Sequence, residues 1–112
     1  MSDTVLQEAL QKSVECLKQI FGSKLQDVIL YGSYARGDYD DESDVDIAAI
    51  VDIERININA HMKPVAELMS DLSLEYEVLI SIATLPAVEF DYWKDNLPYY
   101  RNIVNEGVRL SA

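Results

Sequence analysis

The stretch that decides the fold is Ile29-Leu30-Tyr31-Gly32-Ser33-Tyr34-Ala35-Arg36-Gly37-Asp38, followed by Asp40-Asp41-Glu42-Ser43-Asp44-Val45-Asp46-Ile47. An apolar run ends at a Gly-Ser turn, an acidic loop follows, and two carboxylates one residue apart begin a second apolar run. Residues i and i+2 of a strand point to the same face, so Asp44 and Asp46 would lie about 7 Å apart along the backbone. Their mutual repulsion costs free energy unless a cation lies between them.

Length and composition predict one small globular domain, residues 1–112. The chain has 112 residues, 49% of them hydrophobic, and a formal net charge of -11, and a chain of this size has room for a single core. The negative charge argues against non-specific binding to nucleic acid, which needs clustered Lys and Arg. It is consistent either with a basic protein partner or with a surface that only serves solubility.

Cysteine content and hydropathy indicate a cytoplasmic protein. Cys16 is the only cysteine, so neither an internal disulfide nor a cysteine-based metal site can form. The N-terminal segment lacks the charge and apolar core of a secretion signal, and no run of 18 uncharged apolar residues occurs. We therefore expect a reducing compartment and no membrane segment.

The apolar spacing predicts helices and strands along most of the chain. Residues 4–21 show helical spacing, with Ser2 or Thr4 as the N-cap. Residues 25–31 and 45–51 are apolar runs typical of buried strands. Between them, residues 34–36 are expected to form one or two helical turns that end at Gly37.

The second half of the chain is expected to contain further helices and one more strand. Residues 53–74 are mostly helical in pattern, and Pro64 either opens a new helix or kinks an existing one. We expect a third strand at residues 76–83 and helices at 86–94 and 98–105. The fold class is therefore α+β (or α/β), a small sheet covered by helices, and periodicity alone does not decide whether the sheet is mixed.

The two aspartates suggest a magnesium site beside a phosphate site. A carboxylate in a buried strand is costly unless it is paired or bound to a metal. Mg²⁺ is usually held by one or two carboxylates together with substrate phosphates and water. Gly32 and Ser33 at the preceding turn offer backbone N–H groups and a hydroxyl to phosphate oxygens.

At these residues the sequence resembles a known family. Gly32-Ser33, the ten residues 34–43, and Asp44-Val45-Asp46 are similar to the signature of nucleotidyltransferases of the DNA polymerase beta superfamily. The short chain resembles their minimal nucleotidyltransferase (MNT) branch. A weaker resemblance continues through Leu97-Pro98-Tyr99-Tyr100-Arg101-Asn102-Ile103 and Glu106-Gly107-Val108. It implies a mixed sheet of the polymerase-beta-like nucleotidyltransferase fold.

The resemblance implies two-metal nucleotidyl transfer. Asp44 and Asp46 would hold Mg²⁺ against a triphosphate whose terminal phosphates bind Gly32 and Ser33. An acceptor hydroxyl would attack the α-phosphate, and pyrophosphate would leave. Arg36 would either neutralise a phosphate or pair with Asp38 or Asp40 to hold the loop.

A third carboxylate normally completes the site in this family, from the neighbouring strand. The candidates here are Glu75 and Glu77, which would share a strand face with Leu79, and Glu77 is preferred because it lies nearer the strand centre. Some relatives carry the acid at the position of Leu79. The resemblance thus implies Asp44, Asp46 and Glu77 as metal ligands and catalytic residues.

Other residues are weaker candidates. His61, the only histidine, is expected at the surface. Tyr34 and Tyr39 flank the proposed site and are candidates for stacking on a base, although packing is the simpler role. The tail aromatics Phe90, Tyr92, Trp93, Tyr99 and Tyr100 are expected to pack into the core, with a partner surface as the alternative.

The resemblance implies an enzyme that moves AMP, or another NMP, from a nucleoside triphosphate such as ATP to a hydroxyl. The chain has no length for an acceptor domain, so the acceptor comes from outside. In the MNT branch this is typically a HEPN-domain toxin ribonuclease with an Arg-x₄-His motif, and the MNT antitoxin adenylylates one of its tyrosines. The alternative is a binding module with a degraded site that neutralises a HEPN partner by complex formation alone.

Overall fold

A mixed four-stranded sheet forms the centre of the protein. The structure is a computed structural model and describes residues 1–111. The strands are β1 (Leu25–Tyr31), β2 (Val45–Val51), β3 (Ile80–Pro86) and β4 (Val108–Ser111). Their order in the sheet is β3-β2-β1-β4, where β2 and β3 are parallel and the other two pairs are antiparallel.

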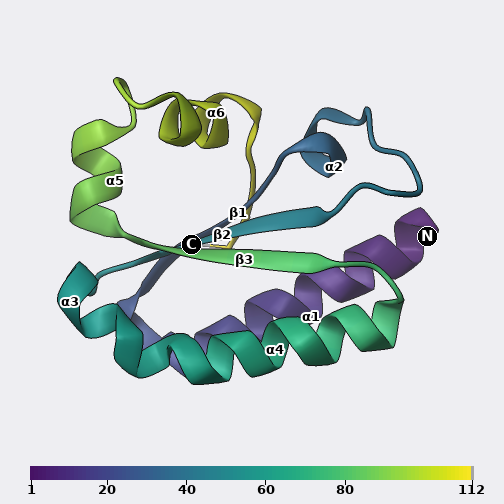
Figure 1. Ribbon diagram of the computed structural model, residues 1–112, viewed down its shortest axis with the longest axis horizontal. Coiled ribbons are helices and arrows are strands. Elements are labelled where there is room, and N and C mark those ends of the chain that lie inside the picture. The colour runs from purple at the N-terminus through teal and green to yellow at the C-terminus, as the bar shows by residue number, and fades with distance from the viewer. Residues whose placement is uncertain (112) are drawn as a thin grey trace.

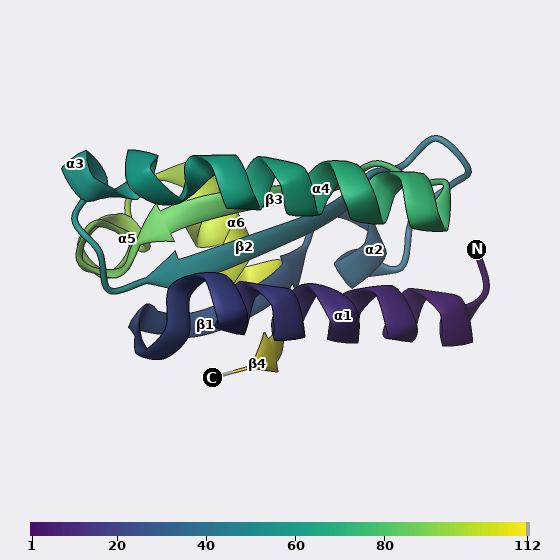
Figure 2. The same cartoon turned by 90° about the horizontal axis from the view of Figure 1, so that it is seen from below.

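Helices cover both faces of the sheet. The two long helices, α1 (Asp3–Phe21) and α4 (Met62–Tyr76), lie on one face, and α5 (Ala87–Trp93) and α6 (Pro98–Glu106) lie on the other (Figures 1 and 2). The short helix α2 (Ser33–Arg36) follows β1, and α3 (Arg55–Ile58) follows β2. Two 3₁₀ turns, Gly22–Lys24 and Asn59–His61, connect the elements. Within residues 1–111, no helix is both long and apolar enough to cross a membrane.

The central strand β2 is covered on both faces, which explains why its sequence is almost continuously apolar. Val45, Ile47, Ala49 and Val51 pack into the core under α1 and α4. Ala48 and Ile50 pack into a second, smaller core with α5 and α6. Because faces alternate along a strand, Asp46 lies on the same face as Ala48 and α6.

The expected fold class is confirmed. The strands at residues 25–31 and 45–51 have the predicted bounds, and α1 carries the predicted cap, since the Ser2 side chain accepts a hydrogen bond from the Val5 N–H at 3.2 Å. Pro64 lies in the first turn of a new helix, α4, as one of the two alternatives required. The sheet is mixed.

In the second half, one expectation is wrong and one strand was not predicted. The third strand begins at Ile80 and not at residue 76, because α4 continues to Tyr76 with Leu68 and Leu72 at helical spacing in the core. The sequence also gave no indication of β4, a short edge strand that pairs only with β1. Its ladder depends on contacts between residues about 80 positions apart, such as Ile29 and Arg109.

Candidate active site

The turn after β1 has a backbone conformation that favours glycine. Gly32 has φ 76 and ψ -157, and its carbonyl accepts hydrogen bonds from the N–H groups of Ala35 at 3.1 Å and Arg36 at 3.0 Å. Gly37, with φ 88, ends the helix and donates to the Ser33 carbonyl at 2.9 Å. Ser33 and Tyr34 begin α2, where N–H groups have no intrahelical acceptor and are free to meet an anion.

The carboxylate of Asp46 lies directly against this turn. A Cβ atom added to Gly32 would stand 2.5 Å from Oδ2 of Asp46. The absence of a side chain at Gly32 therefore makes room for the Asp46 carboxylate, in addition to permitting the positive φ. The structure thus brings together the two halves of the motif that the sequence places 14 residues apart.

The surroundings of Asp46 disfavour its charged form. Burial raises the pKa of the Asp46 carboxyl above its ordinary value, the nearby charge of Asp44 raises it further, and Arg36 lowers it. Asp44 itself is exposed and precedes the first residue of β2. A half-buried carboxylate with a second carboxylate beside it is the donor set that Mg²⁺ takes with substrate phosphates, so these two residues fit that ion.

Arg36 is held by two carboxylates. Its Nε donates to Asp38 at 3.1 Å and its Nη1 donates to Glu106 at 2.8 Å. Of the two alternatives for Arg36, the pair with Asp38 is present, whereas Asp40 accepts hydrogen bonds from the Glu42 N–H and the Ser43 hydroxyl of the loop. The contact with Glu106 was not predicted, since the two residues are 70 positions apart.

The expectation that Glu75 and Glu77 lie on a strand is wrong. Glu75 lies on α4, and Lys12 of α1 donates to both of its oxygens, at 2.8 and 2.9 Å. This ion pair lowers the pKa of Glu75. Glu77 ends α4 as an exposed residue in the left-handed conformation, with φ 54 and ψ 37. Both residues precede β3 because α4 extends further than the sequence indicated.

The strand next to Asp46 carries no acid at the matching positions. Ser81 pairs with Asp46 across the parallel ladder, and the carbonyl of Leu79 accepts a hydrogen bond from the Val45 N–H at 2.9 Å. Within residues 1–111, no group of three or more His, Cys, Asp or Glu side chains is arranged to hold a metal ion. The role of Glu77 as third carboxylate stays a prediction. Glu77 ends α4 and does not lie in β3, the strand next to the aspartate pair.

Tyrosines surround the turn. The rings of Tyr34 and Tyr39 stack on each other, with centroids 4.2 Å apart and an interplanar angle of 9°. The two ring faces that meet in this stack are therefore not available to a nucleotide base. The hydroxyls of Tyr31 and Tyr99 lie 2.8 Å apart. Tyr31 is the cross-strand neighbour of Asp46, and burial and the Tyr99 hydrogen bond raise its pKa, so its hydroxyl stays protonated at neutral pH.

The remaining candidates have mixed outcomes. His61 is half-buried and not fully exposed as expected, because its ring packs on Phe21 at a centroid distance of 5.1 Å. Phe90 and Tyr100 belong to the core, as expected for the tail aromatics. Tyr92, Trp93 and Tyr99 are exposed instead.

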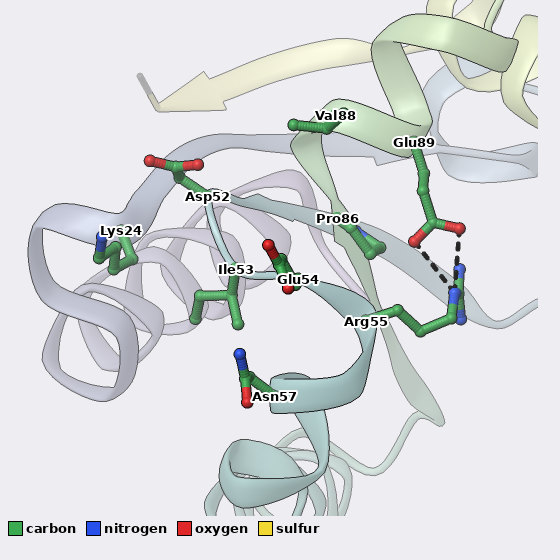
Figure 3. A pocket seen from close by; sticks show the side chains of 9 residues that line it. All are labelled: Lys24, Asp52, Ile53, Glu54, Arg55, Asn57, Pro86, Val88 and Glu89. Atoms are coloured by element: carbon green, nitrogen blue, oxygen red, sulfur yellow. Dashed lines mark hydrogen bonds and ion pairs between the residues drawn. The ribbon is translucent and has the colours of Figure 1, made fainter.

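A cleft that sequence reasoning missed lies at the other end of β2. It has a volume of about 550 Å³, and its lining includes Asp52, Ile53 and Glu54 just after β2, Pro86 at the end of β3, and Val88 of α5 (Figure 3). Arg55 and Glu89 form an ion pair at its edge, with an N–O distance of 3.1 Å (Figure 3). Asp46 lies near the start of the seven-residue strand β2, so the length of the strand separates the two sites by roughly 20 Å.

Sequence comparisons relate the chain to one family. A profile of the nucleotidyltransferase domain matches residues 10–108. A protein of Methanocaldococcus jannaschii that is provisionally named protein adenylyltransferase is 35% identical over 101 residues, which cover 90% of this chain and 93% of that protein. A second protein of this organism, with the same provisional name, is 42% identical over 74 residues, or 66% of this chain and 73% of that protein.

Solved structures share the fold. A protein described provisionally as a minimal nucleotidyltransferase superposes with a TM-score of 0.63 at 16% identity, covering 96% of this chain and 95% of that one. The MntA–HpeT toxin–antitoxin superposes with a TM-score of 0.60 at 20% identity, covering 92% of this chain and 73% of that one. A complex of the MNT antitoxin with the tri-AMPylated HEPN toxin of Shewanella oneidensis superposes with a TM-score of 0.56 at 20% identity, covering 95% of this chain and 71% of that one.

Proposed function

The chain belongs to the nucleotidyltransferase domain family, and we propose that it is a Mg²⁺-dependent enzyme that transfers AMP from ATP to a hydroxyl of a protein partner. The observation that carries the proposal is the contact between Gly32 and Asp46, which joins a turn suited to phosphates to a carboxylate suited to a metal. The relatives named as protein adenylyltransferases support a protein acceptor and the adenylyl group. We place the enzyme in the cytoplasm, where ATP is available.

 In this proposal Asp44 and Asp46 would hold Mg²⁺, as two ions in the two-metal mechanism. When bound there, Mg²⁺ would neutralise charge on the phosphates and polarise the α-phosphate. The N–H groups at the start of α2, the Ser33 hydroxyl and Arg36 bind the terminal phosphates. Glu77 is the candidate for the third carboxylate.

The transfer itself is a displacement at the α-phosphorus. The acceptor oxygen forms a bond to phosphorus, the bond to the β-phosphate oxygen breaks, and pyrophosphate leaves. The proton of the acceptor hydroxyl passes to a carboxylate of the site or to water. The residues of this chain contribute orientation and charge, because they fix the triphosphate between the turn and the aspartates.

We further propose that the acceptor is a tyrosine of a HEPN-domain toxin and that the chain is its antitoxin. The structural neighbours include an MNT antitoxin in complex with an AMPylated HEPN toxin, and a complex with AMP-PNP. The acidic loop of the chain has six carboxylates between residues 38 and 46 and no Lys or Arg. A basic surface around the acceptor tyrosine would complement this loop.

Exposed apolar side chains on α5 and α6 support a protein partner. Half of the large exposed apolar side chains that the structure describes lie between residues 88 and 104, namely Val88, Tyr92, Trp93, Leu97, Tyr99 and Val104. Tyr99 connects this segment to the active site through its hydrogen bond with Tyr31. We propose that the acceptor protein binds the surface formed by Val88, Tyr92 and Trp93 of α5 and by Leu97 just before α6. We call this surface the α5–α6 patch.

The proposal is tested by label transfer. Purified protein is incubated with Mg²⁺, α-labelled ATP and a co-expressed HEPN-domain protein. We expect label on a tyrosine of the partner, and we expect Asp44→Asn and Asp46→Asn to abolish the transfer while circular dichroism shows an intact fold. Transfer that survives both substitutions would contradict the assignment of the site.

A second function has one observation in its favour. The described residues bring no third carboxylate into β3 beside Asp46, and this is what a binding module with a degraded site would show. Tight association with the HEPN-domain protein in the absence of any label transfer would favour this alternative.

A further inference from the structure

Helix α6 makes side-chain hydrogen bonds to the chain on both sides of Gly32 and Ser33. At its beginning, the Tyr99 hydroxyl lies 2.8 Å from the hydroxyl of Tyr31, the residue before Gly32. At its end, Glu106 accepts a hydrogen bond of 2.8 Å from Arg36, the last residue of α2. The nine-residue helix α6 therefore contacts the chain on both sides of the Gly32–Ser33 turn, at Tyr31 and at Arg36.

We propose that Glu106 is a positioning residue for the nucleotide, which acts by holding the guanidinium of Arg36 in one orientation beside the triphosphate site. This inference rests on the proposed function, since it assumes that a nucleotide binds at the Gly32 turn. It adds a residue that lies 60 positions beyond the sequence motif and that does not touch the nucleotide itself.

Arg36 needs such a restraint. It is the only Lys or Arg between residues 25 and 54, and it stands beside a loop with six carboxylates. Its side chain is 43% exposed, so a free guanidinium would exchange among several acidic partners. Bonds from Nε to Asp38 and from Nη1 to Glu106 fix the plane of the guanidinium and leave its other N–H donors for phosphate oxygens.

Glu106 is itself held firmly. Its side chain is only 28% exposed, and the next residue, Gly107, packs so closely that a Cβ atom there would collide with the Ile103 carbonyl and the Ile29 side chain. Ile103 is fully buried, and its carbonyl accepts the Gly107 N–H at 2.9 Å. The carboxylate thus projects from a rigid point of the core.

Charge alone would act on nucleotide affinity in the opposite direction. Glu106 neutralises part of the Arg36 charge, and its own negative charge repels a triphosphate. If this repulsion outweighed the positioning, removal of Glu106 would tighten nucleotide binding. The sign of the change in affinity therefore decides between the two effects.

The experiment measures the affinity for Mg²⁺·AMP-PNP by isothermal titration calorimetry, which requires no acceptor protein. We expect Glu106→Ala to weaken binding by about threefold to tenfold, as for the loss of one charge-assisted hydrogen bond at a partly exposed site. Glu106→Gln keeps an acceptor oxygen and should weaken binding less. The matched control is Glu89→Ala, which breaks the Arg55–Glu89 pair at the far end of β2 and should leave the affinity unchanged.

A double-mutant cycle separates positioning from a purely structural role. If Glu106 acts through Arg36, Glu106→Ala has no further effect on affinity in an Arg36→Met protein. An equal loss in both backgrounds, or unchanged or tighter binding by Glu106→Ala alone, overturns the inference while leaving the proposed function intact. Failure of the unaltered protein to bind Mg²⁺·AMP-PNP overturns both.

Discussion

The carboxylate of Asp46 occupies the space that a side chain at Gly32 would fill, since a Cβ atom there would stand 2.5 Å from Oδ2. This contact joins the end of β1 to the beginning of β2, where Tyr31 and Asp46 form the last residue pair of the ladder. It makes Gly32 necessary for two separate reasons, its positive φ and the close approach of Asp46.

We predict that Gly32→Ala lowers the free energy of unfolding by about 2 to 3 kcal/mol, because strain at positive φ adds to the collision with Asp46. Chemical denaturation measures this loss, and calorimetry should show that Mg²⁺·AMP-PNP no longer binds. Gly37→Ala is the matched control, since Gly37 also has positive φ but has nothing within 4 Å of the added Cβ. It should cost only about 1 to 2 kcal/mol. Equal losses for the two variants would contradict the close approach.

We predict that Asp46→Asn stabilises the metal-free protein at neutral pH, with a rise in Tm of a few degrees at most. The pKa of Asp46 is raised in the folded state, so folding favours its protonated form. The associated stability is present below the ordinary pKa of Asp and is lost as the pH rises through the raised pKa. The uncharged amide avoids this loss.

Thermal denaturation at several pH values measures the effect. The advantage of Asp46→Asn should disappear in acid, where Asp46 is protonated in both states, and saturating Mg²⁺ with AMP-PNP should stabilise only the unaltered protein. A variant that is less stable at neutral pH without metal would show that the Asp46 carboxylate makes favourable contacts instead.

We predict that Glu77→Gly raises the free energy of unfolding by about 1 kcal/mol, because Glu77 has a left-handed backbone that costs a residue with a Cβ atom roughly this much. The same variant removes the candidate third carboxylate. We expect label transfer to fall less than it does in Asp46→Asn, since Glu77 lies outside β3. Glu75→Gln, which breaks the pair with Lys12, is the control for charge removal on α4. Complete loss of transfer in Glu77→Gly alone would place Glu77 among the catalytic residues.

We predict that Tyr92→Ala and Trp93→Ala each weaken association with the HEPN-domain partner by roughly tenfold, as exposed aromatic residues of an interface core typically do. Surface plasmon resonance measures the affinity. Leu74→Ala is the matched control, because Leu74 is 77% exposed on α4, on the opposite face of the sheet (Figure 2). A similar loss for Leu74→Ala, or none for the two aromatics, would remove the α5–α6 patch from the interface.

The local part of this structure could be predicted from the sequence. The apolar runs of β1 and β2 have no competing pattern, so their bounds were predicted correctly. Gly32 and Gly37 indicated the turn and the end of α2, because glycine adopts the positive φ angles found there without steric cost. The spacing of Asp44 and Asp46 likewise identified the candidate site, since it required only the alternation of a strand.

The boundary between α4 and β3 could not be predicted, because the apolar pattern of residues 76–83 suits a strand, whereas α4, which packs against α1, continues to Tyr76 and residues 77–79 form the connection to β3. The same boundary removed Glu75 and Glu77 from the strand. Glu106 and β4 came from contacts made only when distant segments meet, and no local signal in the sequence records such contacts.

The sequence by itself thus determined the elements whose conformation depends on neighbouring residues: the strands around Gly32, the turn, and the acidic loop. Only the tertiary structure decided which carboxylate rests on Gly32, which face α6 covers, and that Glu106 reaches Arg36. The physical reason is that backbone preference and apolar periodicity act over a few residues, whereas ion pairs and close approaches depend on the packing of the whole chain.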